Sequence, residues 1–400
     1  MAVIALFLTI LQRRLERCVP APPASPSRQP PSHLLLTPST DIYARHGGTA
    51  ALPKEPGLNS APPDFPRGLF NAQDGAPHAR QRRIFGPAFT NTALRAQEPL
   101  LRGHVRKLVA NVRRACAEGA GAATVNMADL FGFLTFDVMA DLAFGAPLGL
   151  LDAGVYSPWV RNVFAVFRLL CLRVVLLQYL PLVSRMLTPL LASKAVVEER
   201  KAYMGYTSSL VDKRLGRSED VDRPDIWTLV EKKGDALARA EMHANAALFM
   251  TAGTETTATA LAGTVWFLTK HPETMARLVE EVRGMEGGEE AFTMETLAKL
   301  PYLDAVINES MRLYPPTPDM LYRLVPEGGA VISGSHVPAG AMVGLHQRPA
   351  YRSRHNFHRP EEFLPERWLP EAAAGGEFVN DDRPVFQPFS IGPRSCIGKK

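Results

Sequence analysis

A loop built around one cysteine constrains this chain more than any other stretch. It reads FSIGPRSCIG, residues 389–398, in a chain of 400 residues with only four cysteines. Glycines flank the cysteine and can adopt backbone angles closed to other residues, so the stretch predicts a tight loop. Crowded backbone amides, and a cation such as Arg394, would favour the thiolate of Cys396. A thiolate is a soft, strongly donating metal ligand, whereas a lone cysteine is more often a small buried apolar side chain.

The composition is that of a globular protein, with 46% hydrophobic and 21% charged residues. The net charge of +5 falls far short of what nucleic-acid binding requires, but it suits an acidic protein partner. The cysteines are too scattered for a disulfide framework, and no CxxC pair suggests a zinc site. We therefore expect a reducing environment that faces the cytosol.

The N-terminal segment has an apolar run, residues 2–11, that is followed by arginines. The run is too short to span a bilayer, but as the remnant of a membrane anchor it would leave the rest of the chain cytosolic. A short amphipathic leader or an incorrectly predicted first exon is an equal alternative, and a cleaved signal peptide is less favoured because the charges follow the run. With the proline-rich stretch 19–31, this predicts a leader and linker over 1–40 and one folded domain over 41–400.

Helical periodicity dominates the folded part. Residues 159–192 are apolar but interrupted by arginines, which favours a pair of helices that are partly exposed or touch a membrane surface. Residues 331–345 resemble a hairpin, so a small sheet region is expected near the C-terminus. Further helices are expected at about 93–119, 125–145, 241–271, 271–284 and 300–316.

The spacing F-x-x-G-x-R-x-C-x-G, carried by Phe389, Gly392, Arg394, Cys396 and Gly398, resembles the haem-ligand loop of the cytochromes P450. The resemblance implies the mainly helical P450 fold with small β-sheets, and haem as the cofactor. It makes Cys396 the proximal ligand of the haem iron, where a thiolate pushes electron density onto the metal and favours O–O cleavage. Phe389 would pack near the sulfur, and Arg394 would pair with a haem propionate.

The stretch ESMR places Glu309 and Arg312 three residues apart on one helix face. Another copy of this spacing, Glu280 to Arg283, has the character of an ordinary solvated pair. Only the ESMR copy is followed by LYPPTP and later by FLPERW. The resemblance implies a buried triad of Glu309, Arg312 and Arg367, which would lock the proximal side structurally.

The stretch AGTETT, residues 252–257, lies within the longest expected helix. A packing glycine beside a neighbouring helix explains it equally well from the residues alone. By resemblance, Ala252, Gly253, Glu255 and Thr256 match the oxygen-binding motif over the haem, where the helix opens locally. Thr256 would hold a water or the oxygen bound at the iron, and Glu255 would relay protons from solvent.

HARQRR, residues 78–83, resembles the family's W-x-x-x-R pattern, in which both side chains bind haem propionates. His78 replaces the tryptophan and can still donate a hydrogen bond to a carboxylate, while Arg82 keeps the arginine's role. Arg83 is expected to face solvent. Arg323 occupies a position where the family often has another propionate ligand, although an exposed loop arginine is the alternative.

The resemblance implies a monooxygenase that inserts one atom of O2 into a small apolar organic substrate, with electrons from NADPH through NADPH-cytochrome P450 reductase. It implies that the protein lies on the cytosolic face of the endoplasmic reticulum membrane. The stretches around DIYARHGG and HARQRR also resemble those of fungal secondary-metabolite enzymes. Substrate choice would depend on 159–192, on the segment before Gly253 and on 317–322. The reductase would dock on basic residues expected on the proximal side, namely Arg82, Arg83, Arg394, Lys399 and Lys400.

The chain departs from the family at both ends. The family continues after CIG into a long helix behind the haem, whereas here only Lys399 and Lys400 follow, which predicts an incomplete gene model or a truncated product. The sequence leaves two alternatives. One is a non-catalytic remnant that does not hold haem, and the other is a P450-type isomerase or dehydratase that works without O2, against which Glu255 and Thr256 argue.

Overall fold

The structure is a computed structural model, and the residues that it describes belong to one compact unit, Leu35–Lys400. The predictions for residues 1–36, and for most of 159–192, lie outside the described residues. Among the helices in the described part, none is long and apolar enough to cross a membrane. The described residues are 37–44, 51–56, 67–72, 75–119, 123–161, 163–164, 171–172, 175–176, 180, 194–216, 225–231, 237–319 and 321–399.

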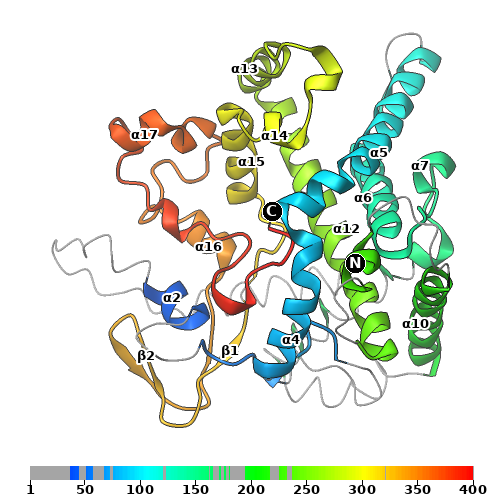
Figure 1. The fold of residues 1–400 in the computed structure, drawn as a ribbon. Coiled ribbons are helices and arrows are strands. Elements are labelled where there is room, and N and C mark those ends of the chain that lie inside the picture. The colour runs from blue at the N-terminus through cyan, green and yellow to red at the C-terminus, as the bar shows by residue number, and fades with distance from the viewer. Residues whose placement is uncertain are drawn as a thin grey trace. The chain divides into compact units, whose positions relative to one another are not determined.

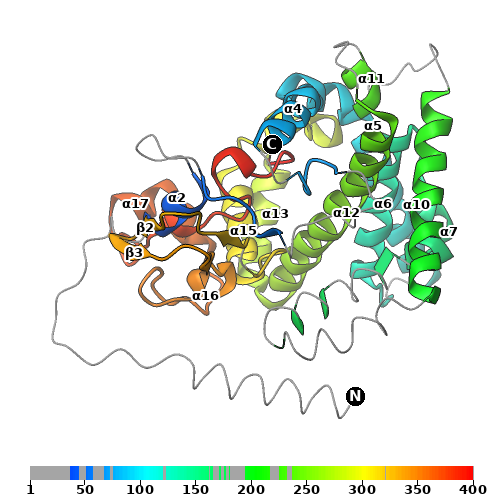
Figure 2. The ribbon, with the colours of Figure 1, turned by 90° about the horizontal axis from the view of Figure 1, so that it is seen from below.

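Helix α12 (Arg239–Lys270) is the longest helix of the described part and runs through its middle (Figure 1). It confirms the helix expected at 241–271. The local sequence determines where α12 ends. Pro272 has no backbone N–H to continue the hydrogen-bond ladder, and it begins α13 (Pro272–Arg283) instead. Helices α6 (Met127–Phe144) and α10 (Lys194–Leu215) lie beside α12 (Figure 2).

Helix α6 confirms the helix expected at 125–145 and has clear signals at both ends. The Asn126 side chain caps its first turn by accepting a hydrogen bond from the Asp129 amide at 3.3 Å. Gly145 ends it at φ 68°, a left-handed conformation that glycine adopts without a steric penalty. Most side chains between these ends are buried, so the helix is apolar on nearly every side.

The largest apolar cluster surrounds the first half of α12. It includes Phe85 of α4 (Gly75–Phe85), whose ring meets those of Phe249 and Trp227 edge-on at 5.0 and 6.0 Å between centroids. Helix α5 (Asn91–Glu118), which confirms the helix expected at 93–119, and α11 (Ile226–Glu231) also contribute to it. A second cluster joins the end of α12 to α13 and α15 (Pro301–Leu313).

The described strands form two small antiparallel sheets, which confirms the minor sheet region. Strands β2 (Ala330–Ile332) and β3 (Ser335–Val337) form the expected hairpin, with positive φ at Ser333 and Gly334 in its turn. Strand β4 (Met342–Val343) pairs instead with β1 (Arg323–Leu324). The remaining short helices are α2 (Thr37–Tyr43), α7 (Leu150–Ala153), α14 (Met294–Leu297), α16 (Gln347–Tyr351), α17 (Pro370–Ala374), and the 3-10 turns η2 (Gly86–Phe89), η3 (Gly288–Ala291), η4 (Pro365–Trp368), η5 (Arg383–Val385) and η6 (Gly392–Arg394).

Candidate functional site

The cysteine loop closes on itself. The Cys396 amide donates a hydrogen bond to the Phe389 carbonyl at 2.8 Å, and the cysteine side chain is exposed. Gly392 has φ 77°, and a Cβ there would lie 2.0 Å from the Tyr43 carbonyl oxygen, so only glycine fits. Gly398 does not have a positive φ. A Cβ added there would lie 3.9 Å from the Cys396 sulfur, which is an ordinary van der Waals contact. The expected backbone demand therefore applies to Gly392 and not to Gly398.

Apolar side chains hold this loop from two sides. Ile391 packs against the cluster that contains Tyr43 and Val325. Ile397, which follows the cysteine, packs against the large cluster that contains Phe249 and Met250 of α12. The cysteine thus lies between the small sheet region and the helical core.

Helix α4 is tied directly to the cysteine loop. Arg82 donates through Nη1 to the Ser395 carbonyl at 2.6 Å and through Nη2 to the Ser395 hydroxyl at 3.4 Å. His78 lies one turn earlier on the same helix and is only 6% exposed. Arg83 is exposed, as expected. The HARQRR stretch therefore places an imidazole and a guanidinium beside the loop.

Five basic side chains gather around this point, and we call them the cationic cluster: Lys54, His78, Arg82, Arg323 and Arg394. Burial, followed by the charges of Arg394 and Arg323, lowers the pKa of Lys54 to about 7. Burial, followed by Arg394, Arg82 and Lys54, lowers the pKa of His78 to about 4. Burial also lowers the pKa of Arg323, against an opposing effect of the Tyr43 phenol.

The cations of the cluster bond to backbone oxygens. Lys54 Nζ donates to the Phe70 carbonyl at 2.6 Å, and Arg323 Nη1 donates to the Tyr322 carbonyl at 3.0 Å. Arg394 donates to the Ala72 carbonyl. Among the described residues, no carboxylate contributes to the pKa shifts of Lys54, His78 or Arg323. Mutual repulsion and burial thus leave this cluster electrostatically suited to a bound anion.

Lys54 was missed by the sequence analysis. No motif marks it, because it enters the site through an isolated β-bridge to Arg323 and a 2.9 Å bond from the Leu324 amide to the Pro53 carbonyl. It is 8% exposed, and its ammonium lies 3.9 Å from the centre of the Phe70 ring. The only local signal is a lysine in a stretch rich in proline, which ordinarily indicates a solvated loop.

The donor set fits the haem that the family resemblance implies. A ligand with two carboxylates would neutralise the repelling cations, and a neutral His78 can still donate an N–H to such a group. An exposed thiol in a closed loop beside these cations offers a soft ligand to a metal. The cations that suit the carboxylates and the thiol that suits the metal are brought together by α4, β1 and the cysteine loop.

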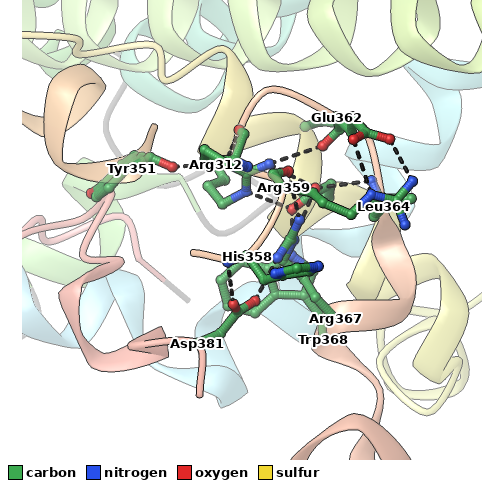
Figure 3. A network of polar contacts seen from close by, with 12 residues as sticks. Arg312, Tyr351, His358, Arg359, Glu362, Leu364, Arg367, Trp368 and Asp381 are labelled. Carbon is green, nitrogen blue, oxygen red and sulfur yellow. Dashed lines mark hydrogen bonds and ion pairs between the residues drawn. The ribbon is translucent and has the colours of Figure 1, made fainter. Parts of the chain in front are cut away.

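A second polar site is centred on Glu309 and Arg312 of α15 and is shown in Figure 3. Glu309, Arg312 and Arg367 are fully buried. Arg312 binds Glu309 in a bidentate manner, with both nitrogen–oxygen distances at 2.8 Å, and Arg367 Nε reaches the same carboxylate at 3.1 Å. Arg312 also donates to the carbonyls of Tyr351 and Pro360 at 2.7 and 2.6 Å. The structure thus brings together the three residues of the expected triad.

Two members of this network were not foreseen. Asp381 accepts a hydrogen bond from Arg367 Nη1 at 2.5 Å, and the Trp368 indole donates to Glu309 at 2.9 Å. Two buried guanidiniums need more than one carboxylate, so the triad itself signalled that a second acid must exist. Nothing in the sequence around Asp381 pointed to which acid it would be.

The AGTETT stretch lies in an uninterrupted α-helix, so the expected local opening is not seen in the described residues of α12. The Thr256 hydroxyl donates to the Ala252 carbonyl at 2.6 Å, one turn back. A Cβ on Gly253 would lie 2.5 Å from the sulfur of Met139 on α6, which is the packing role that the sequence analysis weighed as an alternative. Ala252 and Thr256 are exposed, whereas Glu255 is half-buried.

Glu255 faces a different space from Thr256. It lines a cavity of about 270 Å³ between α6 and α12, together with Asp129, Tyr156 and other side chains. The acid and the alcohol of the motif are therefore neighbours in sequence, but only the acid lies on this cavity.

Comparison with known proteins gives a consistent result. The cytochrome P450 family model matches residues 41–400. Cytochrome P450 monooxygenase efuB of Hormonema carpetanum is 39% identical over 369 residues, which are 90% of this chain and 70% of that relative. Cytochrome P450 monooxygenase astJ of Aspergillus oryzae is 39% identical over 375 residues, with 90% and 71% covered. Averantin hydroxylase of Aspergillus parasiticus is 37% identical over 335 residues, with 82% and 65% covered.

Proposed function

The chain belongs to the cytochrome P450 family, and on that premise we propose that it is a haem-thiolate monooxygenase. It would insert one atom of O2 into a small apolar organic substrate and release the other as water, with electrons from NADPH delivered by a reductase. The observation that carries this proposal is the cationic cluster beside the Cys396 loop. The fungal relatives support a substrate from secondary metabolism, and the family supports the cytosolic face of the endoplasmic reticulum membrane.

When bound, haem supplies the iron at which O2 is activated. Cys396 would bind that iron through its thiolate. Arg82 holds the backbone of the neighbouring residue, Ser395, by a hydrogen bond to its carbonyl. Lys54, Arg323 and Arg394 would hold the propionates, and neutral His78 would donate a hydrogen bond to them. This assignment would bring an anionic ligand to these four members of the cationic cluster.

Proton handling falls to two residues on α12. The hydroxyl proton of Thr256 is committed to the Ala252 carbonyl, so its oxygen is left to accept a hydrogen bond and can position a water. Glu255, the preceding residue, would hold a proton at its carboxyl on the neighbouring cavity, and water would have to carry that proton to the Thr256 side of the helix. The Glu309 network has no part in this chemistry and supports the fold of the proximal side.

The test is turnover in the holoenzyme with a fungal NADPH-cytochrome P450 reductase. Wild type should oxidise NADPH and consume O2, and the product should carry label from ¹⁸O2. Replacement of Cys396 by Ala should abolish both haem retention and turnover. Product formation without NADPH and O2 would instead indicate the isomerase or dehydratase class. Unchanged haem binding and activity in Cys396→Ala would defeat the proposal.

A further inference from the structure

The cavity between α6 and α12 is lined by several side chains that can carry protons. Its lining includes Asp129, Glu255 and Tyr156, together with threonines and apolar side chains. A volume of about 270 Å³ has room for several waters, and polar walls of this kind retain them. Donors and acceptors therefore share one space that reaches from the first turn of α6 to the middle of α12.

Tyr156 is held firmly in this cavity. Its ring meets Phe133 at 4.7 Å and Phe164 at 5.2 Å between centroids, both edge-on. Its hydroxyl lies over Gly132, where an added Cβ would come within 2.1 Å of the phenol oxygen. The aromatic contacts and the missing side chain of Gly132 thus aim the hydroxyl into the cavity rather than into the apolar core.

The surroundings of this hydroxyl keep it protonated. Burial, followed by the negative charges of Asp129 and Glu255, raises the pKa of Tyr156 to about 12. At neutral pH the phenol is therefore a neutral group that can donate one proton and accept another. Both carboxylates act on the phenol, which also shares a hydrogen bond with Asp129.

Asp129 is the member of this set at the N-terminal end of α6. It lies in the first turn of α6, next to the exposed residues Asn126 and Ala128, and Asn126 Nδ2 donates to its carboxylate at 2.7 Å. Glu255 lies on α12, directly before Thr256. Asp129, Tyr156 and Glu255 thus line the same cavity, and Asp129 is the one that lies next to exposed residues at a helix end.

We propose that Asp129 and Tyr156, with the water of the cavity, form the path by which protons from solvent reach Glu255. One proton enters the phenol oxygen from the Asp129 side as the phenol's own proton leaves toward Glu255. The phenol ends as it began, and one proton has moved inward. Asp129 and Tyr156 are positioning and relay residues, and the inference rests on the proposed proton-delivery role of Glu255.

The test compares Tyr156→Phe, Asp129→Asn and wild-type holoenzyme with reductase and without added substrate. The readouts are the rate of NADPH oxidation under O2 and its solvent isotope effect in H2O and D2O. Tyr206→Phe is the matched control, because it removes a phenol that is 43% exposed on α10, outside the cavity. Thermal unfolding of each variant verifies that the aromatic packing survives.

Tyr156→Phe should slow NADPH oxidation by about tenfold or more and enlarge the solvent isotope effect, since loss of general acid–base function typically costs about a hundredfold or more when nothing replaces it. Asp129→Asn should shift both readouts in the same direction but less, and Tyr206→Phe should shift neither. A wild-type rate in Tyr156→Phe, or a slower rate with an unchanged isotope effect, would overturn the proposal. A wild-type holoenzyme that never oxidises NADPH would remove the proposed function, and this inference with it.

Discussion

Buried arginines at two places in this molecule have different partners. Arg312 and Arg367 are fully buried, and they bind Glu309 and Asp381 within one network (Figure 3). Arg323, which is 3% exposed, bonds to backbone carbonyls, and burial lowers its pKa while other cations surround it. The first group is complete within the chain. The second carries a positive charge that a ligand with carboxylates would neutralise, so burial alone does not distinguish a structural arginine from a binding one.

The largest effect should come from breaking the complete network. Glu309→Gln would leave two buried guanidiniums without their shared charge, and removing one partner of a buried ion pair costs about 3–5 kcal/mol. The free energy of unfolding, from urea denaturation, should fall by that amount. Glu280→Gln is the matched control, because Glu280 and Arg283 have the same spacing on α13 and are both exposed. It should change stability by less than about 0.5 kcal/mol, and equal losses in the two variants would remove the distinction.

A binding arginine should show the opposite pattern. Arg323→Gln should leave the unfolding free energy of the haem-free protein unchanged or higher, because it removes a repelling buried cation. The same variant should lose haem about tenfold faster, since one charge-assisted hydrogen bond contributes about 1.5–3 kcal/mol. Transfer of haem to excess apomyoglobin measures this rate. A large loss of stability with unchanged haem transfer would instead make Arg323 structural.

Lys54 permits a smaller effect with a defined pH window. Its pKa is lowered from 10.5 to about 7, so between these values the unfolded chain binds more protons than the folded one. Its destabilising contribution is fully present below pH 7 and disappears as the pH rises toward 10.5. Lys54→Met should therefore stabilise the haem-free protein by about 1–3 kcal/mol at pH 6, and this gain should shrink by pH 10.

The difference between Lys54→Met and wild type isolates this one group from all others that titrate in the same range. With haem bound, the variant should lose its advantage, because the propionates would compensate the ammonium in wild type. A gain in stability that is independent of pH would show that burial and the neighbouring charges do not lower the pKa of Lys54.

Short-range patterns made much of this fold predictable. Helical periodicity located α5, α6 and α12 to within a few residues, and Pro272 marked the end of α12. The residues of the expected triad could be named only through the resemblance to the P450 family, which ESMR, LYPPTP and FLPERW carry. The register of the small sheets could not be predicted in full, because β4 pairs with β1 and not within the hairpin.

The unpredicted parts of the site depend on contacts between distant segments. Lys54 meets Arg323 through an isolated bridge between the segment 51–56 and strand β1, and Asp381 meets Arg367 across 14 residues of chain. Gly398 illustrates the opposite error, since its place in a motif suggested a backbone demand that only Gly392 has. Local pattern identifies which residue types the chemistry needs, whereas the third partner of a buried charge is chosen by tertiary packing.

The most direct measurement is the reduced, carbon-monoxide-bound difference spectrum of the purified protein after haem is supplied. The account predicts a thiolate-type Soret band in wild type, loss of that band in Cys396→Ser, and retention of the band at reduced haem occupancy in Arg323→Gln. A wild-type spectrum without the thiolate band, or the same band in Cys396→Ser, would contradict the assignment of the cysteine loop and the cationic cluster as the haem site.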